Sequence, residues 1–140
     1  MAVARYLGDK SALARLAKPV VRDVLQPLLE RGLVATCALV DLGFGHNATS
    51  AEALTQLLDD RRAIYPWVPI PDTVWTRAQD VQLLLADRGQ HRGVGIPDLL
   101  IAATAEVHDL VVLHYDNDFD LIASVTKQRT QWVAPAGTAD

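Results

Sequence analysis

Several features that would suggest other kinds of protein are scarce or missing in this chain. Cysteine occurs once, at Cys37, so no intrachain disulfide can form, which suits a reducing cytoplasm. No apolar run reaches the roughly 18 residues that cross a bilayer, and the N-terminus lacks the charged-then-apolar layout of a secretory signal. A basic excess is also absent, because the net charge is −4. Any contact with a polyanion must therefore be local or use bound cations.

What is present suits one compact domain. The chain has 140 residues, of which 50% are hydrophobic, and it contains no repeat or long linker. We expect a single domain over residues 1–133 and a disordered tail over residues 134–140, where Pro, Gly and small residues dominate. Cys37 stands in an apolar setting, which predicts a buried, inert thiol rather than a nucleophile.

Short apolar runs alternate with helical patterns along the chain. Strands are predicted near Val3–Leu7, Leu33–Cys37, Ile64–Ile70, Leu110–His114 and Thr130–Val133. Helices are predicted over Pro19–Arg31, Ala51–Arg61, Thr73–Arg88 and Pro97–Val107, the first and third stopped by Gly32 and Gly89. This alternation predicts an α/β fold with a mainly parallel sheet of four to five strands, covered by helices on both faces.

Aspartates stand at the ends of these predicted strands and at the start of a predicted helix. Asp9 follows the first strand, Asp98 opens the last of the predicted helices, and Asp116 and Asp118 follow the fourth strand. Ligands of parallel sheets bind outside the carboxyl ends of the strands. The topology therefore brings all of these carboxylates to one edge of the sheet.

Each aspartate alone could be a helix cap or a turn former. Taken together, carboxylates this close would repel one another, and a hard cation such as Mg²⁺ or Mn²⁺ would resolve that repulsion. Such a metal binds a phosphate oxygen and lowers the pKa of a water molecule, which phosphodiester hydrolysis requires. A carboxylate free of the metal could orient or deprotonate that water.

Other candidate groups carry a weaker signal. The four histidines show no metal-ligand spacing, no glycine-rich phosphate loop is present, and Ser11 is better interpreted as a cap or a partner of Asp9. Arg88, His91 and Arg92, just before Asp98, could form a basic lip for an RNA backbone or could simply be a solvated helix end.

The acidic segments resemble a known family. Tyr6–Leu13, which reads Tyr-Leu-Gly-Asp-Lys-Ser-Ala-Leu, resembles the opening of a VapC-type PIN-domain toxin. The runs His91–Gly93, Ile96–Ala103 and His114–Phe119 resemble later motifs of the same family, in the same order and at matching separations. The resemblance covers nearly the whole chain.

The resemblance implies a PIN-like three-layer α/β/α sandwich, a homodimer and an Mg²⁺- or Mn²⁺-dependent endoribonuclease of a type II toxin–antitoxin system. The implied substrate is structured RNA, either tRNA or a ribosomal RNA loop, and the implied partner is a cognate VapB-like antitoxin whose tail occupies the acidic groove. By motif match, Asp9 and Asp98 are the principal metal ligands, Asp116 is a further ligand, and Asp118 is a supporting catalytic acid.

One position departs from the family pattern. Members resembling this chain carry a Glu where Gly43 stands in Val40-Asp41-Leu42-Gly43. If this stretch is helical, as the family implies, a glycine there costs ~1 kcal/mol relative to alanine. Asp41 is an unsuitable substitute, because two residues along a helix rotate a side chain by about 200°. The missing carboxylate suggests weakened or abolished catalysis, whether the glycine was introduced to tolerate a toxic protein or belongs to a natural degenerate member with partial activity.

Competing functions fit the residues less well. A metal-dependent phosphatase would want an Asp-x-Asp pair after the first strand, which Asp9-Lys10-Ser11 does not supply. A signalling receiver module would need a second acid near Asp9 and a lysine after a late strand, where Lys127 is poorly placed. A catalytically weak or inactive homologue that binds and sequesters the antitoxin remains open because of Gly43.

Overall fold

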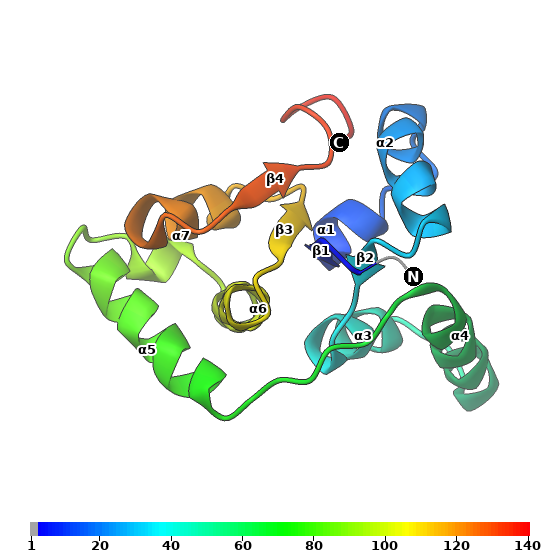
Figure 1. Ribbon diagram of the computed structural model, residues 1–140, viewed down its shortest axis with the longest axis horizontal. Coiled ribbons are helices and arrows are strands. Elements are labelled where there is room, and N and C mark those ends of the chain that lie inside the picture. The colour runs from blue at the N-terminus through cyan, green and yellow to red at the C-terminus, as the bar shows by residue number, and fades with distance from the viewer. Residues whose placement is uncertain (1–2) are drawn as a thin grey trace.

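The computed structural model describes residues 3–140, which form one parallel sheet surrounded by helices (Figure 1). The strands are β1 (Tyr6–Gly8), β2 (Val34–Ala35), β3 (Val111–His114) and β4 (Thr130–Trp132). The helices are α1 (Lys10–Leu13), α2 (Pro19–Glu30), α3 (Ala38–Gly45), α4 (Ala51–Ile64), α5 (Thr73–Ala86), the 3₁₀ turn η1 (His91–Gly93), α6 (Ile96–Val107) and α7 (Asp118–Thr126).

The sheet has four strands in the order β2-β1-β3-β4, and every neighbouring pair is parallel. Leu7 pairs with Ala35 on one side and with Val112 on the other, so β1 is a central strand. In Figure 1, α3, α4, α5 and α6 lie below the sheet, whereas α2 lies above it. The predicted fold class, a three-layer α/β/α sandwich around a mainly parallel sheet, is confirmed.

Glycines end two of the predicted helices as expected. Gly32 and Gly89 have φ angles of +67° and +68°, a left-handed conformation that only glycine adopts without strain. They follow α2 and α5 closely, which explains why the ends of these helices can be predicted from the sequence.

The strand predicted over Ile64–Ile70 is wrong. Ile64 is the last residue of α4, and only an isolated bridge between Thr36 and Trp67 joins this segment to the sheet. Pro66 and Pro69 lack the amide hydrogens that a regular ladder requires. Apolar residues in this segment serve packing instead, since Val68 and Ile70 lie against the core.

The tail after Val133 also differs from the expected disorder. Ala134 and Ala139 are buried, and the amide of Ala139 donates to the Tyr115 hydroxyl oxygen at 2.9 Å. The small residues that suggested disorder allow the chain to turn back onto the domain.

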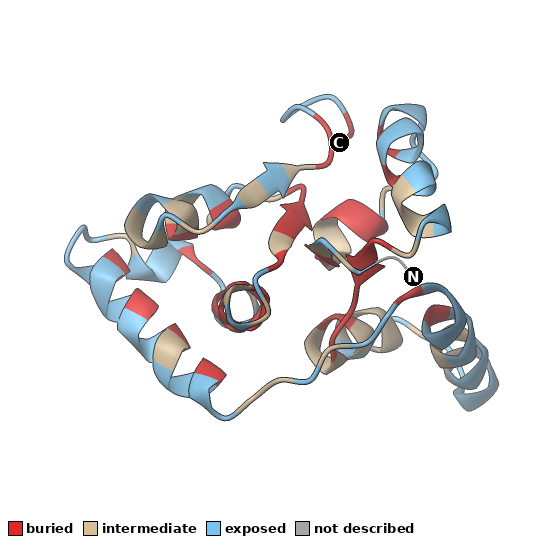
Figure 2. Ribbon diagram, viewed as in Figure 1, coloured by how far each residue is buried: buried red, intermediate tan, exposed pale blue. Residues whose placement is uncertain are grey.

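The buried residues gather on the sheet and the helix faces against it (Figure 2). Cys37 is fully buried, as predicted, and burial raises the pKa of its thiol. Within residues 3–140, no helix has the length and apolar character that crossing a membrane requires.

Candidate metal centre

The predicted acidic residues converge at the carboxyl ends of β1 and β3. Asp9 follows β1 directly, and its amide donates to the Leu113 carbonyl oxygen at 2.9 Å, which joins the two strand ends. Asp116 lies in the loop after β3, and Asp118 is the first residue of α7. Asp98 enters from the first turn of α6. Parallel topology thus assembles the group from distant parts of the chain.

Asp9 is the most buried of these carboxylates, with 5% of its surface exposed. It caps α1, because its Oδ2 accepts hydrogen bonds from the Ser11 amide at 3.0 Å and from the Ser11 hydroxyl. The Ser11 hydroxyl oxygen in turn accepts the Tyr115 amide at 2.9 Å. Ser11 is therefore a partner of Asp9, as predicted, and it also fixes the loop that carries Asp116.

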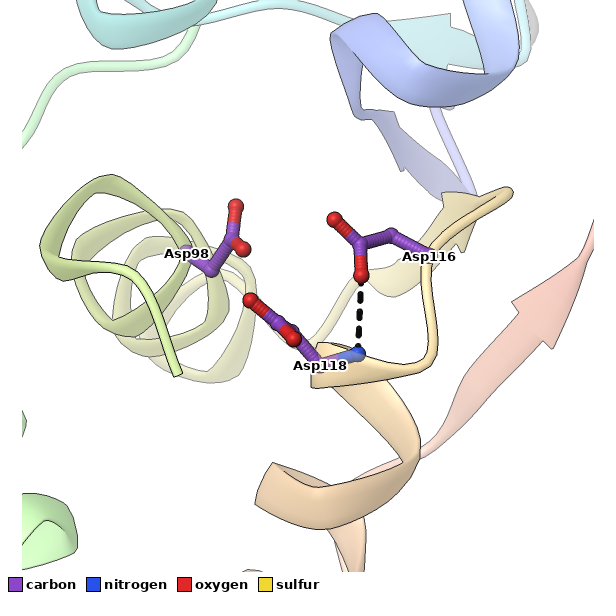
Figure 3. A group of neighbouring side chains, drawn as sticks. All are labelled: Asp98, Asp116 and Asp118. Carbon is purple, nitrogen blue, oxygen red and sulfur yellow. Dashed lines mark hydrogen bonds between the residues drawn. The ribbon is translucent and has the colours of Figure 1, made fainter. Parts of the chain in front are cut away.

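Asp98, Asp116 and Asp118 point toward a common space (Figure 3). Each offers one carboxylate oxygen, and these three oxygens all lie within 4.8 Å of one another. Asp116 Oδ1 accepts the Asp118 amide at 2.9 Å, and Asp118 Oδ2 accepts the Gly95 amide at 3.2 Å. These backbone donors hold two of the carboxylates in position while leaving other oxygens free.

The carboxyl groups of Asp98 and Asp9 both have raised pKa values. Burial, a hydrogen bond with Asp118 and the nearby negative charges raise the pKa of Asp98 to about 8. Asp98 lies in the first turn of α6, where the helix dipole favours a negative charge. Burial and the neighbouring carboxylates outweigh that dipole. Burial also raises the pKa of Asp9, with a further contribution from Asp116.

A cleft of about 370 Å³, here called the acidic cleft, contains most of the group. Its lining residues are Asp9, Lys10, Ser11, Ala14, Arg15, Leu39, Val40, Gly43, Pro97, Asp98, Ile101 and Asp116. Asp9 is outside the three-oxygen group yet shares the cleft with Asp98 and Asp116. The roles predicted for the four aspartates, with Asp9, Asp98 and Asp116 as metal ligands, stay predictions.

Gly43 lies in α3 and lines this acidic cleft. The Lys10 Nζ donates to the Gly43 carbonyl oxygen at 2.9 Å. A Cβ at Gly43 would meet only the flexible Lys10 side chain, whose Cδ would lie 3.6 Å away in ordinary contact. The site therefore has room for a side chain at this position.

The Asp41 side chain lies outside the acidic cleft. Its Oδ1 accepts hydrogen bonds from Arg61 Nε at 2.9 Å and from Thr36 Oγ1 at 3.0 Å. It lines a separate groove between α3 and α4, together with Leu42, and does not line the acidic cleft. A rotation of about 200° between the two helix positions explains this separation.

The basic lip predicted from Arg88, His91 and Arg92 is exposed, and none of its members lines the acidic cleft. Arg88 Nη1 donates to the Ser124 hydroxyl at 3.3 Å. The link from η1 to α6 approaches the acidic group, because the Gly95 amide reaches Asp118. Contact of this lip with RNA stays a prediction.

Sequence reasoning missed two side chains beside the acids. His114 is fully buried, and its Nδ1 accepts the Asp116 amide at 3.2 Å. Arg15 lines the acidic cleft and is held by the tail. The position of His114, two residues before Asp116, could have identified it from the sequence. No local pattern identifies Arg15, because its partner Ala139 is far along the chain.

The residues present fit a hard divalent cation. Three converging carboxylate oxygens provide the donors that Mg²⁺ or Mn²⁺ prefers. Burial and the neighbouring carboxylates raise the pKa of Asp98, so both disfavour its charged form. A bound cation would favour that charged form.

Comparisons with known proteins agree with this architecture. The PIN domain model matches residues 6–125. Ribonuclease VapC21 of Mycobacterium tuberculosis is 52% identical over 135 residues, covering 96% of this chain and 98% of the relative. Ribonuclease VapC51 of Mycobacterium tuberculosis is 48% identical over 136 residues, covering 97% of this chain and 98% of the relative.

Solved structures share the fold at low sequence identity. VapBC2 from Rickettsia felis, bound to a promoter DNA fragment, matches with a TM-score of 0.72 at 14% identity, over 91% of this chain and 98% of that chain. VapBC-1 from nontypeable Haemophilus influenzae matches with a TM-score of 0.70 at 16% identity, over 91% and 97%.

The fold and its acidic edge define a PIN domain. The family match and the near-full-length relatives then place the chain more narrowly: it belongs to the PIN-domain family, among the VapC-type proteins.

Proposed function

We propose that this chain is a cytoplasmic endoribonuclease toxin of a type II toxin–antitoxin system that depends on Mg²⁺ or Mn²⁺. The observation that carries the proposal is the convergence of Asp98, Asp116 and Asp118, whose oxygens lie within 4.8 Å of one another. The names of the relatives, ribonucleases VapC21 and VapC51, support the same activity. The substrate class is structured RNA, either tRNA or a ribosomal RNA loop.

When bound, the cation supplies Lewis acidity toward a phosphate oxygen and lowers the pKa of a water molecule. Asp9, Asp98 and Asp116, which line the same acidic cleft, would hold it. Ser11 keeps Asp9 in place and restrains the Tyr115 amide, so that Asp116 remains directed into the cleft. Asp118 Oδ2 is tied to the Gly95 amide, and its second oxygen can orient a water molecule.

Incubation of the purified chain with total RNA tests the proposal. We expect fragments with Mg²⁺ or Mn²⁺ and none with a chelator. Asp98→Asn should reduce the cleavage rate by at least about a hundredfold, because it removes a ligand charge. Asp23→Asn, which changes an exposed acid on α2, is the matched control and should cleave as the wild type does. Fragments that persist in the chelator would refute the metal-dependent reaction.

We propose a VapB-like antitoxin as the partner and a homodimer as the assembly of the toxin. The structural neighbours include VapBC complexes, which supports the first part. Trp75, Leu83 and Ile96 are more than half exposed on α5 and α6, and such an apolar surface favours association. Co-expression with an antitoxin encoded beside the toxin, followed by mass measurement of the complex, tests both parts.

Gly43 favours a second candidate function, a weak or inactive homologue that binds and sequesters the antitoxin. The acidic cleft lacks one carboxylate that the family pattern supplies, while its remaining surface is intact. Intact RNA in every metal condition, together with tight binding of the antitoxin, would favour this alternative over the nuclease.

A further inference from the structure

The C-terminal tail is fastened beside the acidic cleft through Tyr115. The Tyr115 hydroxyl accepts the Ala139 amide at 2.9 Å and donates to Asp140 Oδ1 at 2.8 Å. Ala139 is 1% exposed, so the tail is packed against the domain. Tyr115 directly precedes Asp116, which places the end of the tail at the edge of the acidic group.

Arg15 joins this tail to α1. Its Nε donates to the Ala139 carbonyl oxygen at 3.0 Å, and its Nη1 donates to the Ser11 carbonyl oxygen at 2.7 Å. The guanidinium carbon lies 4.5 Å from the centre of the Tyr115 ring. Two backbone carbonyls and an aromatic face therefore fix the guanidinium in one place.

All of these partners of Arg15 are uncharged. In residues 3–140, no carboxylate oxygen lies within 4.0 Å of its guanidinium, whereas Arg61, Arg77 and Arg129 each form an ion pair. A guanidinium has five N–H donors, and two are used by the carbonyls, so about three remain for a ligand. Arg15 thus keeps both its positive charge and donors available.

The side chain of Arg15 lies where bound RNA would meet its positive charge. Arg15 lines the acidic cleft with Asp9, Asp98 and Asp116. An RNA strand that enters this cleft brings several phosphates past a group of carboxylates, and a metal ion can neutralise only the phosphate next to it. A neighbouring phosphate needs a separate cation, and the planar fork of arginine matches the geometry of phosphate oxygens.

We propose that Arg15 contacts a backbone phosphate of RNA bound in the acidic cleft, at a nucleotide beside the scissile bond, and that the tail holds its side chain ready. The inference rests on the proposed ribonuclease function. Immobilisation by Ala139 and Tyr115 lowers the entropy lost when the phosphate binds. The contact reads no base, so it contributes affinity for any RNA sequence.

The salt dependence of RNA binding tests this contact. The full-length protein is titrated against a fluorescently labelled RNA stem-loop, which represents the proposed class of structured RNA and has a single-stranded loop of mixed sequence. Ca²⁺ is the cation, and gels confirm that the RNA stays intact. For Arg15→Gln we expect about tenfold weaker binding. We also expect the slope of log affinity against log salt to fall by about 0.7, the contribution of one phosphate contact on a single strand. The ratio of wild-type to variant affinity then shrinks by about 2.6-fold between about 50 and about 200 mM salt.

Two variants separate this role from a structural one. Arg15→Lys keeps the charge and should restore most of the slope, though it loses the fork. Arg129→Gln removes an arginine at the amino end of β4, the opposite edge of the sheet, and should keep the wild-type slope. Unfolding midpoints of all variants show whether the fold is retained.

Each result decides between the ideas. An unchanged salt slope in a folded Arg15→Gln protein overturns the phosphate contact while leaving the ribonuclease proposal standing. Absence of RNA binding by the wild type overturns both. A slope that falls equally in Arg15→Gln and Arg129→Gln also overturns the inference, because it would show a diffuse effect of net charge.

Discussion

Lys10 donates from its Nζ to the carbonyl oxygen of Gly43 at 2.9 Å, and both residues line the acidic cleft. The ammonium group therefore lies beside the position where the resemblance to the family predicts a carboxylate. Lys10 also lies over the Phe44 ring, 5.6 Å from its centre. This arrangement leaves a cation at a point where an acid would otherwise add to the ligand group.

The first prediction concerns Gly43→Glu, which introduces the carboxylate that the resemblance to the family predicts. A side chain fits here, so we expect faster Mg²⁺- or Mn²⁺-dependent RNA cleavage, by about tenfold or more, because the cleft gains a ligand charge. Gly43→Gln is the matched control, since glutamine has nearly the helix propensity of glutamate and carries no charge. Equal cleavage rates for the Glu and Gln variants would show that the missing acid does not limit catalysis.

Metal-free protein should lose stability as the pH rises. The pKa of Asp98 is raised to about 8 in the folded protein, above the ordinary value of 3.8, so the folded state holds a proton that the unfolded state releases. The stabilising contribution of Asp98 is therefore greatest below its unfolded pKa and declines as the pH rises toward 8. Between about pH 4 and about pH 6.5 the opposite contribution of His114 offsets it, so the net decline is expected above about pH 6.5. Urea unfolding in a chelator between about pH 5 and about pH 9 measures this decline.

Asp98→Asn is the control for that pH dependence. It should flatten the decline between about pH 5 and about pH 9, because it removes the titrating group. Added Mg²⁺ should restore stability to the wild type at high pH, where the carboxylates are ionised and bind the cation. If the wild type and Asp98→Asn showed the same dependence of stability on pH, the predicted contribution of Asp98 would be contradicted.

Asp41 should matter for stability and little for metal binding. Its partner Arg61 has a side chain only 7% exposed, so Asp41→Ala leaves a buried charge unpaired. We expect a loss of about 3 kcal/mol in the free energy of unfolding. Mn²⁺ affinity, measured by electron paramagnetic resonance, should stay within about twofold of the wild type because Asp41 lies outside the acidic cleft. A large fall in Mn²⁺ affinity would instead make Asp41 a substitute ligand.

The sequence predicted the parallel fold and the acidic edge because both depend on local patterns. Gly32 and Gly89 mark helix ends by their own backbone geometry, and the position of Asp9 or Asp116 after a strand follows from topology. The strand expected over Ile64–Ile70 failed because apolar content alone does not distinguish a strand from an extended, packed segment.

Contacts between distant residues could not be predicted. Arg15 meets Ala139 across 124 positions, and neither carries a local signal for the other. The tail was therefore expected to be disordered, although its small residues pack on Tyr115. Likewise, Asp41 and Arg61 pair across two helices whose relative placement no periodicity defines.

His114 supports the last prediction, because it connects the core to Asp116. Its Nδ1 accepts the Asp116 amide, which requires an unprotonated nitrogen there and places the ring hydrogen on Nε2. That Nε2 has no hydrogen-bond partner among the described residues, and the Phe119 and Trp132 rings lie 5.0 and 5.1 Å away. Burial lowers the pKa of His114 to about 4.

A lowered pKa means that the unfolded state takes up a proton more readily than the folded state. His114 should therefore contribute stability above about pH 6.5 that is lost as the pH falls toward 4, by up to about 3 kcal/mol. His114→Asn keeps an acceptor near the Nδ1 position, whereas His114→Phe keeps the ring packing and loses the acceptor. Both should lose this part of the acid dependence relative to the wild type in urea unfolding.

Only His114→Phe should also weaken Mn²⁺ binding, because the Asp116 amide then lacks its acceptor and the loop is less fixed. Equal Mn²⁺ affinities in the two variants would restrict His114 to packing.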